Sequence, residues 1–318
     1  MAGICRGHPH NHFQHRVANM TQSGILLIDK PEGPSSAQVV GRIKAISGAK
    51  KLGHLGTLDP FASGLLLVGV NEGTKVADIF ISAAKSYRGV MVLGVATDSQ
   101  DATGNVIKER PVPPVGKSEL KELERKFTGE LQQIPPMFSA LKKDGVRLYK
   151  LARQGKEIPR APRAITIETL RLCKSGEAEI ELDVTCSRGT YVRTLAADMG
   201  EALGCGAHLK SLRRTACGHL RLDNAVTLDE LERLVEKEKI PLLSLSSALG
   251  HLRGVTWRSG WLSRVRLGQQ EILNQIGKPL AGERLVRILD PRGELVALAE
   301  WSEDIPGGLW RLARVFRG

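Results

Sequence analysis

The stretch GHLGTLDPFASGLL, residues 53–66, places a single acidic residue between a glycine-rich segment and a run of leucines. This residue is Asp59. The proline that follows it restricts its backbone to extended conformations, so the chain that carries the carboxylate is stiff. The glycines of the stretch allow tight turns and close approach by another chain or a ligand. The apolar residues 64–70 predict a buried strand directly after this loop.

The tripeptide Leu-Asp-Pro is a weak signal by itself, because the chain contains it twice. Its second copy, residues 289–291, precedes Arg-Gly, which is typical of a plain surface turn. The signal of the first copy is the longer string, in which an aspartate is followed by a strand fit for burial. A partly buried carboxylate needs a positive partner to remain ionised.

A candidate for that partner lies in CSRGTYVRTLAADMG, residues 186–200. Tyr191 and Arg193 alternate, so they share one side if the segment begins extended and then enters a helix. An arginine can hold a carboxylate with two hydrogen bonds. Spacing alone favours plainer interpretations, a core aromatic and a solvated helix charge. Tyr87, in KSYRG (85–89), is ambiguous in the same way.

The composition indicates a soluble globular protein with an excess of positive charge. Of its 318 residues, 42% are hydrophobic, and 46 lysines and arginines outnumber 34 acidic residues, giving a net charge of +12. Such an excess suits a polyanionic partner, although a generically basic protein is an equally good interpretation. Charge does not separate RNA from DNA, or either of them from an anionic membrane.

Cysteine usage and hydropathy argue against several other classes. No apolar run approaches the roughly 18 to 20 residues that span a bilayer, so we expect no membrane segment. The cysteines contain no C-x-x-C pair, which favours free thiols in a reducing compartment over a disulfide framework or a zinc site. These cysteines are Cys5, Cys173, Cys186, Cys205 and Cys217.

The first 23 residues contain no acidic residue and four histidines. A metal-binding tract or an organelle transit peptide would be possible interpretations, but the histidine spacing lacks a matching set of ligands. We favour a disordered leader over residues 1–23, with Met20 as an alternative beginning.

Short apolar runs and helical periods alternate without strict βαβ repetition, which favours an α+β fold over a doubly wound parallel sheet. Near residue 250 the composition changes, and all four tryptophans lie beyond that point among Gly- and Pro-rich turns, which predicts a small β domain over 249–318. The preceding domain is expected over 24–248. Its predicted elements are a strand at 24–30, a helix capped by Ser35 or Ser36 and ended by Gly48, helices at 74–85, 117–127, 190–203 and 227–238, a strand–loop–strand at 87–107, and a hairpin at 164–187.

Basic residues concentrate in two regions. Residues 142–163 carry eight basic residues against two acidic ones, and three of them follow at three-residue steps, which favours one side of a helix. A solvated face is the usual reason for such a run. The eight are Lys142, Lys143, Arg147, Lys150, Arg153, Lys156, Arg160 and Arg163. The second set is Arg188, His208, Lys210, Arg213 and Arg214.

Taken together, these stretches resemble the bacterial tRNA pseudouridine-55 synthase (TruB-type) family. The resemblance is carried by GILLIDKPEGPSS, GHLGTLDPFASGLLLVGV, TKVADIF, KSYRG, IPPMFSALKKDGVRLYKLARQG and SRGTYVRTLAADMGEALGCGAHLKSLRR, collinear over residues 24–240. The remainder resembles the PUA-like RNA-binding β-barrel that ends many members. One departure is Leu55, where members often have a small polar residue, and we expect it to tune local packing.

The resemblance implies a mixed, largely antiparallel central sheet flanked by helices, with a PUA-like barrel at the C-terminus. It also implies that Asp59 is the nucleophile that turns one uridine, flipped out of the T-loop of tRNA, into pseudouridine, with no metal or cofactor. Whether the carboxylate attacks C1′, attacks C6 or assists a glycal route stays open. A need for one nucleophile would explain the missing second carboxylate.

Other residue roles follow from the same resemblance. Arg193 is implied as the ion-pair partner of Asp59, and Tyr87 as the aromatic that stacks on the base and takes part in proton transfer. Substrate-pocket positions are Tyr191 (floor), Leu212 (apolar wall), His54 (prop for the emptied stack), Lys75 (RNA or pocket edge) and Lys30 (packing behind the loop). An insertion at about 132–163 is implied to grip RNA, with Lys142, Lys143, Arg147, Lys150 and Arg153, and with Arg188, His208, Arg213 and Arg214 outside it.

Three functions are compatible with these features: a stand-alone tRNA pseudouridine synthase, a guide-RNA-dependent relative that needs protein partners, and an RNA-binding or RNA-folding protein. The joint presence of Asp59, Tyr87 and Arg193 argues against pure binding, because binding a polyanion does not require a carboxylate. We therefore expect a cytoplasmic, monomeric enzyme that acts on the tRNA T-arm, without a protein partner or a membrane.

Overall fold

The computed structural model describes residues 20–139, 141–143, 145–304 and 307–317. Most of the predicted leader lies outside the described residues. Met20 is buried, and its N–H donates to the carbonyl of Ser47. The side-chain amide of Asn71 donates to the carbonyls of residues 20, 21 and 22. Residues 20–23 are therefore part of the folded domain, and the leader was predicted a few residues too long.

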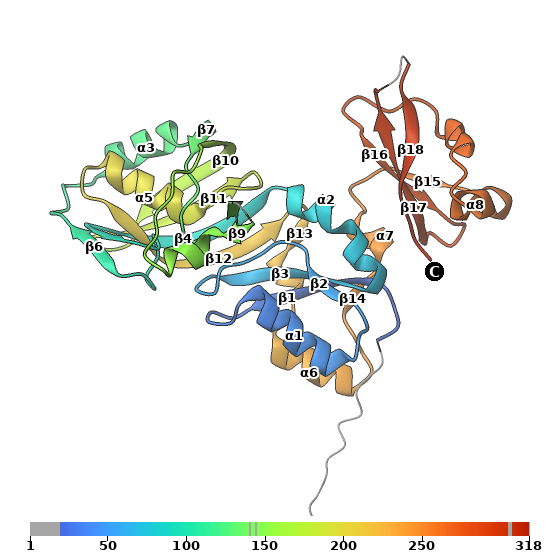
Figure 1. Cartoon of the computed structure of the whole chain (residues 1–318), viewed down its shortest axis with the longest axis horizontal. Helices are drawn as coiled ribbons and strands as arrows, with labels where there is room; N and C mark the ends of the chain where they lie inside the picture. Colours follow the sequence, from blue (N-terminus) through green and yellow to red (C-terminus); the bar gives the residue numbers. More distant parts are fainter. Residues whose placement is uncertain (1–19, 140, 144, 305–306, 318) are drawn as a thin grey trace, which may run out of the picture.

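A ten-stranded sheet forms the centre of the large domain (Figure 1). In the described residues, all neighbouring strands on its main path are antiparallel except β3 and β12, which are parallel. This confirms the mixed, largely antiparallel sheet. The path runs through β14 (Leu242–Leu243), β1 (Gly24–Lys30), β3 (Ser63–Val70), β12 (Ala207–Cys217), β4 (Lys85–Leu93), β11 (Glu179–Cys186), β10 (Arg163–Lys174) and β7 (Gly129–Gln133), with β2 (Leu52–His54) on β3 and β13 (Leu220–Arg221) on β12.

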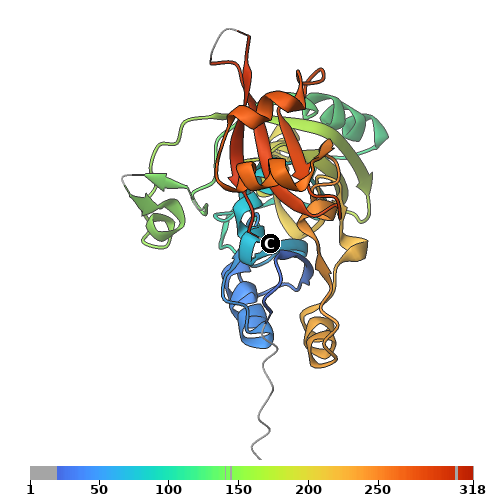
Figure 2. The same ribbon diagram turned by 90° about the vertical axis from the view of Figure 1, so that its right-hand side faces the viewer.

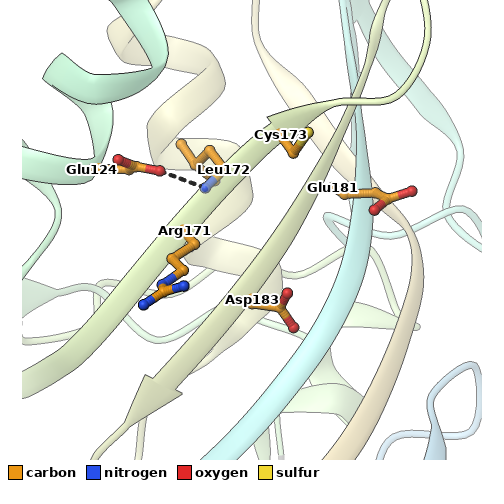
Figure 3. Close-up of a pocket in the computed structure, with 6 residues that line it drawn as sticks. All are labelled: Glu124, Arg171, Leu172, Cys173, Glu181 and Asp183. Atoms are coloured by element: carbon orange, nitrogen blue, oxygen red, sulfur yellow. Dashed lines mark hydrogen bonds between the residues drawn. The ribbon is translucent and has the colours of Figure 1, made fainter. Parts of the chain in front are cut away.

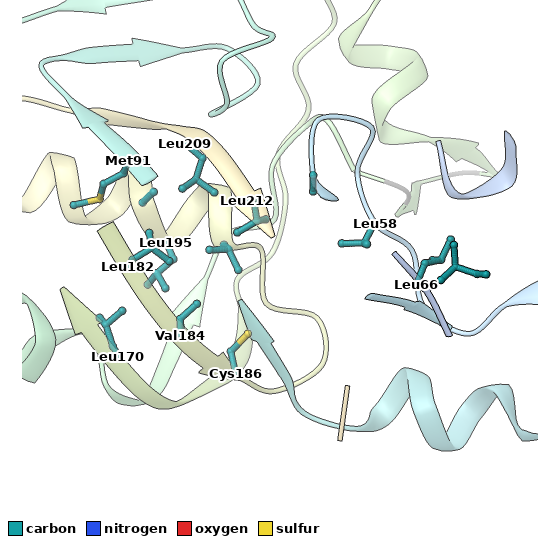
Figure 4. Packing of buried hydrophobic residues seen from close by; sticks show 14 of the residues in the cluster. Leu58, Leu66, Met91, Leu170, Leu182, Val184, Cys186, Leu195, Leu209 and Leu212 are labelled. Atoms are coloured by element: carbon teal, nitrogen blue, oxygen red, sulfur yellow. The ribbon is translucent and has the colours of Figure 1, made fainter. Parts of the chain in front are cut away.

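Strand β3 is buried along its whole length because both of its faces are covered. Leu66 and Val68 belong to the main core of the large domain, part of which is drawn in Figure 4. Leu65 and Leu67 point into a second cluster. The continuous apolar run that predicts this strand is thus explained by two cores, one on each face.

Helices cover the sheet in two groups (Figure 1). Helices α1 (Ser36–Ser47) and α6 (Leu228–Glu236) lie side by side below the β1 end. Helices α3 (Lys117–Lys126) and α5 (Val192–Ala202) lie against the other half. Four of the five predicted helices are thus confirmed, as are the capping box of α1 at Ser35 and the left-handed Gly48 that ends it.

The helix predicted at 74–85 differs in form. It begins as a 3₁₀ turn, η1 (Asn71–Val76), continues as α2 (Ala77–Ser82), and ends before the predicted boundary. The reason is Lys85, the first residue of β4. Its ammonium donates to the carbonyls of Phe80, Ile81 and Ala83. It thus caps the C-terminal end of the helix, where carbonyls have no partner within the helix.

Three smaller groups complete the large domain. The hairpin of β5 (Val95–Thr97) and β6 (Val106–Glu109) confirms the predicted strand–loop–strand. The insertion consists of β8 (Lys142–Lys143), β9 (Val146–Arg147) and α4 (Leu148–Ala152), and it stands to one side of the body in Figure 2. The short elements η2 (Leu222–Asn224) and α7 (Leu245–Ala248) flank α6 in sequence.

The C-terminal domain has its own four-stranded sheet, in the order β15 (Gly254–Thr256), β16 (Leu285–Leu289), β17 (Leu295–Ser302) and β18 (Leu309–Val315). Helix α8 (Ser259–Arg266) and η3 (Glu271–Ile276) pack on it around a core that includes Trp257 and Trp310. The separate small β domain is confirmed, and the change of sheet between Leu243 and Gly254 brackets the predicted boundary.

The two domains share the second cluster that covers β3. Leu298 and Phe316 of the C-terminal domain belong to it together with Leu65 and Leu67. Leu55, the residue that departs from the family pattern, is 2% exposed and lies in the same cluster. The C-terminal domain therefore helps to cover the strand that continues from the Asp59 loop.

Two helical glycines give a matched test of this packing. A Cβ on Gly200 of α5 would lie 2.3 Å from the backbone nitrogen of Ala207, whereas a Cβ on Gly41 of α1 meets nothing within 4 Å. We expect Gly200→Ala to lower the free energy of unfolding by about 1–3 kcal/mol through overpacking. Gly41→Ala should raise it by about 0.5–1 kcal/mol through helix propensity. Urea unfolding followed by circular dichroism measures both; two changes of the same sign would contradict this packing.

Candidate active site

Asp59 lies on the loop between β2 and β3, and neighbouring residues hold this loop in place. The side-chain hydroxyl of Ser36, the first residue of α1, donates to the carbonyl of Leu58 and accepts from its N–H, both at 2.9 Å. Leu58 itself is buried, and the N–H of Gly33 donates to the carbonyl of Pro60. The Asp59 carboxylate, between two anchored residues, remains 39% exposed.

Lys30 lies behind the same loop. It is fully buried, and its ammonium donates to the carbonyls of Pro31 at 2.8 Å and Pro60 at 3.3 Å. Burial lowers the pKa of Lys30 to about 8, while the charge of Asp59 acts in the opposite direction. These contacts agree with the predicted role of Lys30, which is to pack behind the Asp59 loop.

Arg214 also supports this loop. Its Nε donates to the carbonyl of Leu65 at 2.7 Å, and its two terminal nitrogens donate to the carbonyls of Thr57 and Gly56 at 3.2 Å. Its side chain is buried, so the predicted RNA contact is wrong. The fork of the guanidinium satisfies three loop carbonyls instead.

Gly64 makes this approach possible. Its φ is +98°, and a Cβ there would lie 2.3 Å from the carbonyl oxygen of Arg214. Only glycine tolerates both the backbone conformation and the contact. The neighbouring Arg213 is half-exposed; it pairs with Asp29 at 2.6 Å and approaches the hydroxyl of Ser63.

Arg193 enters the site from the first turn of α5 and pairs with Asp59. Its Nε and Nη2 lie 2.9 Å and 2.8 Å from Oδ2 of that carboxylate. The remaining donors reach the carbonyls of Ser99 at 2.6 Å and Phe138 at 3.0 Å. Arg193 is 3% exposed. Tyr191 precedes the helix with extended backbone, as the alternation of the two residues required.

A second carboxylate, Asp101, shares this arginine, and sequence reasoning missed it. Its Oδ1 accepts from the hydroxyl of Ser99 and from the N–H and hydroxyl of Thr103, which leaves Oδ2 facing Arg193 Nε at 3.6 Å. The sequence around Asp59 had indicated a lone carboxylate. In the structure, a second carboxylate therefore accompanies it at Arg193. The stretch DATGN signalled only a turn; the arginine that it serves lies more than 90 positions away.

The structure also describes the two predicted tyrosines, Tyr87 and Tyr191. Tyr87 on β4 is directly opposite Arg214 on β12, and burial raises its pKa to about 12. Burial also raises the pKa of Tyr191, and the charge of Asp59 adds to this effect. Leu212 and Leu58 are both buried members of the main core, and Figure 4 labels both.

Gln133 is a further residue without a sequence signal. It is 3% exposed at the end of β7, where the insertion begins. Its side-chain amide accepts from the N–H of Tyr191 at 2.8 Å and donates to the carbonyl of the same residue at 3.1 Å. Together with the Arg193–Phe138 bond, this joins the base of the insertion to the start of α5.

His54 on β2 is half-buried, and its Nδ1 has no hydrogen-bond partner among the described residues. Burial and, to a lesser extent, the charge of Arg214 lower its pKa, so the imidazole is neutral at physiological pH. It follows that His54 offers this site an uncharged ring.

Lys75 does not belong with these residues. Its ammonium binds Glu72 and the carbonyl of Val315, and it lies 5.7 Å from the centre of the Phe316 ring. The structure thus places it at the junction with the C-terminal domain, and its predicted contact with RNA or the pocket edge stays a prediction. Lys75 lies at this junction because Glu72 provides a negative charge for its ammonium and Val315 of β18 provides a carbonyl acceptor.

Most of the other basic residues that were predicted to contact RNA are exposed, but His208 is half-buried and Lys210 is paired with a carboxylate. Lys142, Lys143, Arg147, Lys150 and Arg153 of the insertion are exposed, and Arg188 is exposed as well. His208 is half-buried and bonds through Nδ1 to the carbonyl of Val95. Lys210 pairs with Glu179.

A pocket of about 470 Å³ opens elsewhere, on strands β10 and β11 (Figure 3). Its lining contains none of the predicted site residues and three carboxylates, which would repel a phosphate backbone. The lining consists of Glu124, Arg171, Leu172, Cys173, Glu181 and Asp183.

In the described part of the chain, no three histidine, cysteine or acidic side chains gather as metal ligands would. Cys173, Cys186, Cys205 and Cys217 are free thiols. None of the described helices is long and apolar enough to cross a bilayer.

Comparisons with known proteins place this architecture in one class. The N-terminal domain model of TruB family pseudouridylate synthases matches residues 44–192, and the C-terminal domain model of tRNA pseudouridylate synthase B matches residues 193–251. A solved structure of a Cbf5-Nop10-Gar1 complex is similar, with a TM-score of 0.69 and 27% identity over 92% of this chain and 85% of that one. Fold and site therefore define a pseudouridylate synthase, an isomerase.

Curated relatives narrow this class of enzyme to one family. A tRNA pseudouridine synthase B of Geobacter sulfurreducens is 44% identical over 305 residues, which are 92% of this chain and 99% of the relative. One from Burkholderia mallei is 42% identical over 91% of this chain and 94% of its own length. The chain belongs to the TruB family.

The roles of two adjacent arginines can be separated by variants that keep their charge. Arg214→Lys replaces the fork that holds three loop carbonyls by a single point charge. We expect the rate of pseudouridine formation at saturating RNA to fall at least tenfold, while RNA affinity is retained. Arg213→Lys, the matched control, should stay close to the unaltered enzyme. Single-turnover kinetics and filter binding check this. Weaker RNA binding with a normal rate in Arg214→Lys would contradict the loop-holding role and support the predicted RNA contact.

Proposed function

We propose that this enzyme converts uridine 55 in the T-loop of tRNA to pseudouridine, acts without a guide RNA, and uses Asp59 as its nucleophile. The strongest support from the structure is the Asp59–Arg193 pair, in which a buried arginine leaves the carboxylate 39% exposed. The tRNA substrate is supported by relatives that are named tRNA pseudouridine synthase B and align with over 90% of this chain.

The reaction rearranges one nucleotide without adding or removing atoms. The bond between N1 of uracil and C1′ of ribose breaks, the base turns, and a bond forms between C5 and C1′. C5 then loses its proton, and N1 carries one in the product. A carboxylate can provide covalent catalysis for this exchange. Arg193 keeps Asp59 aimed, since it holds one carboxylate oxygen with two donors.

Asp101 would hold the arginine rather than touch the substrate. Its Oδ1 is occupied by Ser99 and Thr103, and it is 5% exposed. A second acceptor behind Arg193 offsets part of the cost of burying a guanidinium. Asp59 then keeps its outer oxygen for the reaction.

Tyr87 would stack on the flipped base. With a pKa of about 12, its hydroxyl is protonated at neutral pH. It can therefore donate a hydrogen bond, and it can receive a proton from C5 only while it passes its own to an acceptor. Tyr191 and Leu212 would complete the aromatic and apolar walls of the pocket, with the neutral His54 beside it.

Flipping a base out of a folded loop costs a few kcal/mol, which contacts to the RNA backbone must offset. The exposed cations of the insertion would provide them. The insertion begins at Gln133 and Phe138, which bond to Tyr191 and Arg193, so the RNA grip is continuous with the active site. Arg188 would extend the basic surface beside α5.

A guide-dependent mode is the second candidate, because the similar solved structure is a complex with Nop10 and Gar1. Higher identity to the curated tRNA enzymes favours the stand-alone mode. Incubation of the purified protein with unmodified tRNA alone, followed by mapping of modified uridines, separates the two. Modification of uridine 55 without any partner supports the proposal; no product without added protein partners would favour the guide-dependent mode.

We also propose that the enzyme acts as a monomer in the bacterial cytoplasm, and that it assists tRNA folding. The relatives are bacterial, and their tRNA substrate lies in that compartment. Folding assistance would need the RNA grip but not the nucleophile, so a variant without the carboxylate separates the two activities.

The second Leu-Asp-Pro provides the control for the nucleophile. Asp59→Asn keeps an oxygen acceptor for Arg193, so we expect fold and RNA affinity to persist while pseudouridine formation becomes undetectable. Asp290 caps a surface turn, where its carboxylate accepts from the N–H groups of Arg292 and Glu294. Asp290→Asn should therefore leave the rate unchanged. Single-turnover assays with tRNA measure the rate of pseudouridine formation in both variants. A normal rate in Asp59→Asn would contradict the assignment of Asp59 as the nucleophile.

The insertion can be tested through salt dependence. Arg147 precedes α4, Lys150 lies in its middle and Arg153 follows it, and all three are exposed. Neutralising all three to glutamine should weaken tRNA binding and reduce the slope of log affinity against log salt by about 2. The matched control replaces three exposed lysines of α3, Lys117, Lys121 and Lys126, by glutamine in the same way. It should change the slope little. Equal slopes in both triple variants would mean that the insertion is only a solvated face.

A further inference from the structure

Gln100 has an unusual backbone conformation. In the described residues, three residues other than glycine have a positive φ: Asn71 at 51°, Gln100 at 65° and Glu238 at 56°. Such left-handed values cost free energy in a residue with a Cβ, and asparagine tolerates them best. Glu238 lies in the exposed turn that follows α6, where a left-handed residue is common. Gln100 is half-buried and follows no helix, so its conformation needs another reason.

The turn that contains Gln100 would accept glycine more easily. The N–H of Gln100 donates to the carbonyl of Thr97 at 3.2 Å, so Gln100 is the fourth residue of a β-turn, a position that glycine often occupies. Its own carbonyl accepts from the N–H of Leu209 of β12 at 3.0 Å. Neither bond needs a side chain. The glutamine must therefore be explained by the contacts of its side chain.

The side chain of Gln100 binds the first turn of α5. Its Oε1 accepts from the hydroxyl of Thr194 at 2.7 Å. Thr194 is 4% exposed and directly follows Arg193. Without this acceptor, a buried hydroxyl would lose its partner, which is costly. The bond thus fixes Gln100 to the helical turn that carries the arginine of the site.

The two neighbours of Gln100 bind Arg193 itself. The carbonyl of Ser99 accepts from Nη1 at 2.6 Å, and Oδ2 of Asp101 lies 3.6 Å from Nε. In an extended strand, carbonyls lie along the sheet while side chains point above or below it. A carbonyl and the side chain two positions later then do not converge on one group. The left-handed residue between Ser99 and Asp101 redirects the chain, and both reach the same guanidinium.

We propose that Gln100 is a positioning residue of this enzyme, which holds Ser99 and Asp101 on Arg193 through its left-handed backbone and its bond to Thr194. Three consecutive residues of the turn then hold two consecutive residues of α5. The backbone conformation costs free energy, and in return it sets the direction of the guanidinium toward Asp59. The inference rests on the proposed function in one respect, namely that Asp59 acts in the reaction.

The test separates the rate of reaction from stability. Gln100→Gly relieves the backbone and removes the bond to Thr194, and these two effects on unfolding oppose each other. We expect the midpoint of urea unfolding to change little, while the rate of pseudouridine formation at saturating tRNA falls by about five- to tenfold, the effect of one lost hydrogen bond. The KM for tRNA should stay unchanged. Glu238→Gly, the matched control, relieves the same conformation after α6 and should keep the normal rate.

Variants of the donor test the same bond from α5. Thr194→Val removes the hydroxyl and keeps the shape of the side chain, so it should slow the reaction as Gln100→Gly does. Thr194→Ser keeps the hydroxyl and should restore most of the rate. The double variant Gln100→Gly/Thr194→Val loses no further bond, so it should be no slower than either single variant.

A normal rate in Gln100→Gly, an equal loss in Glu238→Gly, or additive losses in the double variant would overturn the proposal. Asp59→Asn, assayed in parallel, keeps the proposed function separate. If Asp59→Asn reacts at the normal rate while Gln100→Gly and Thr194→Val are slow, the nucleophile assignment fails and the positioning of Arg193 stands. If Asp59→Asn is inactive and the other two variants react normally, only the positioning role of Gln100 fails.

Discussion

The site depends on one physical constraint: buried cations hold a loop that carries an exposed carboxylate. Lys30, Arg193 and Arg214 are each at most 3% exposed, and removing such charges from water is expensive. The structure offsets this cost with backbone carbonyls, which the three side chains bond on five separate segments of the chain. Because each cation needs these carbonyls, the segments are held in one arrangement around Asp59.

This constraint also links the base of the insertion to the surroundings of Asp59. Arg193 takes one of its acceptors from Phe138, at the base of the insertion, and Gln133 clamps the backbone of Tyr191. A displacement of the insertion would therefore leave a buried guanidinium short of an acceptor, which costs about 1–3 kcal/mol.

The C-terminal domain is part of the same framework. Strand β3 leaves the Asp59 loop and is covered on one face by the main core and on the other by a cluster that includes Leu298 and Phe316. Lys75 adds a polar link through the carbonyl of Val315. Leu55 contributes apolar surface to this cluster, which gives a physical role to its departure from the family pattern.

Local patterns were enough to predict much of this molecule. Capping residues, apolar runs and glycine stops depend only on near neighbours, so α1, α6, β1, β3 and the hairpin of β10 and β11 could be predicted from sequence. The joint motifs were specific enough to predict the family and its fold. Side-chain partners were harder. The family resemblance implied that Arg214 contacts RNA, but a resemblance carries no measure of burial, and Arg214 is 2% exposed.

What only the tertiary structure decided are the contacts between distant segments. Asp101 and Asp59 meet on Arg193 although 42 positions separate the two carboxylates, and the stretch around Asp101 indicated only a turn. Gln133 reaches Tyr191 across 58 positions. Such pairs leave no periodic trace, because their spacing is set by sheet topology rather than by the repeat of a helix or strand. The sequence by itself determined that Asp59 sits on a stiff loop before a buried strand; the packing of that sheet determined which charges surround it.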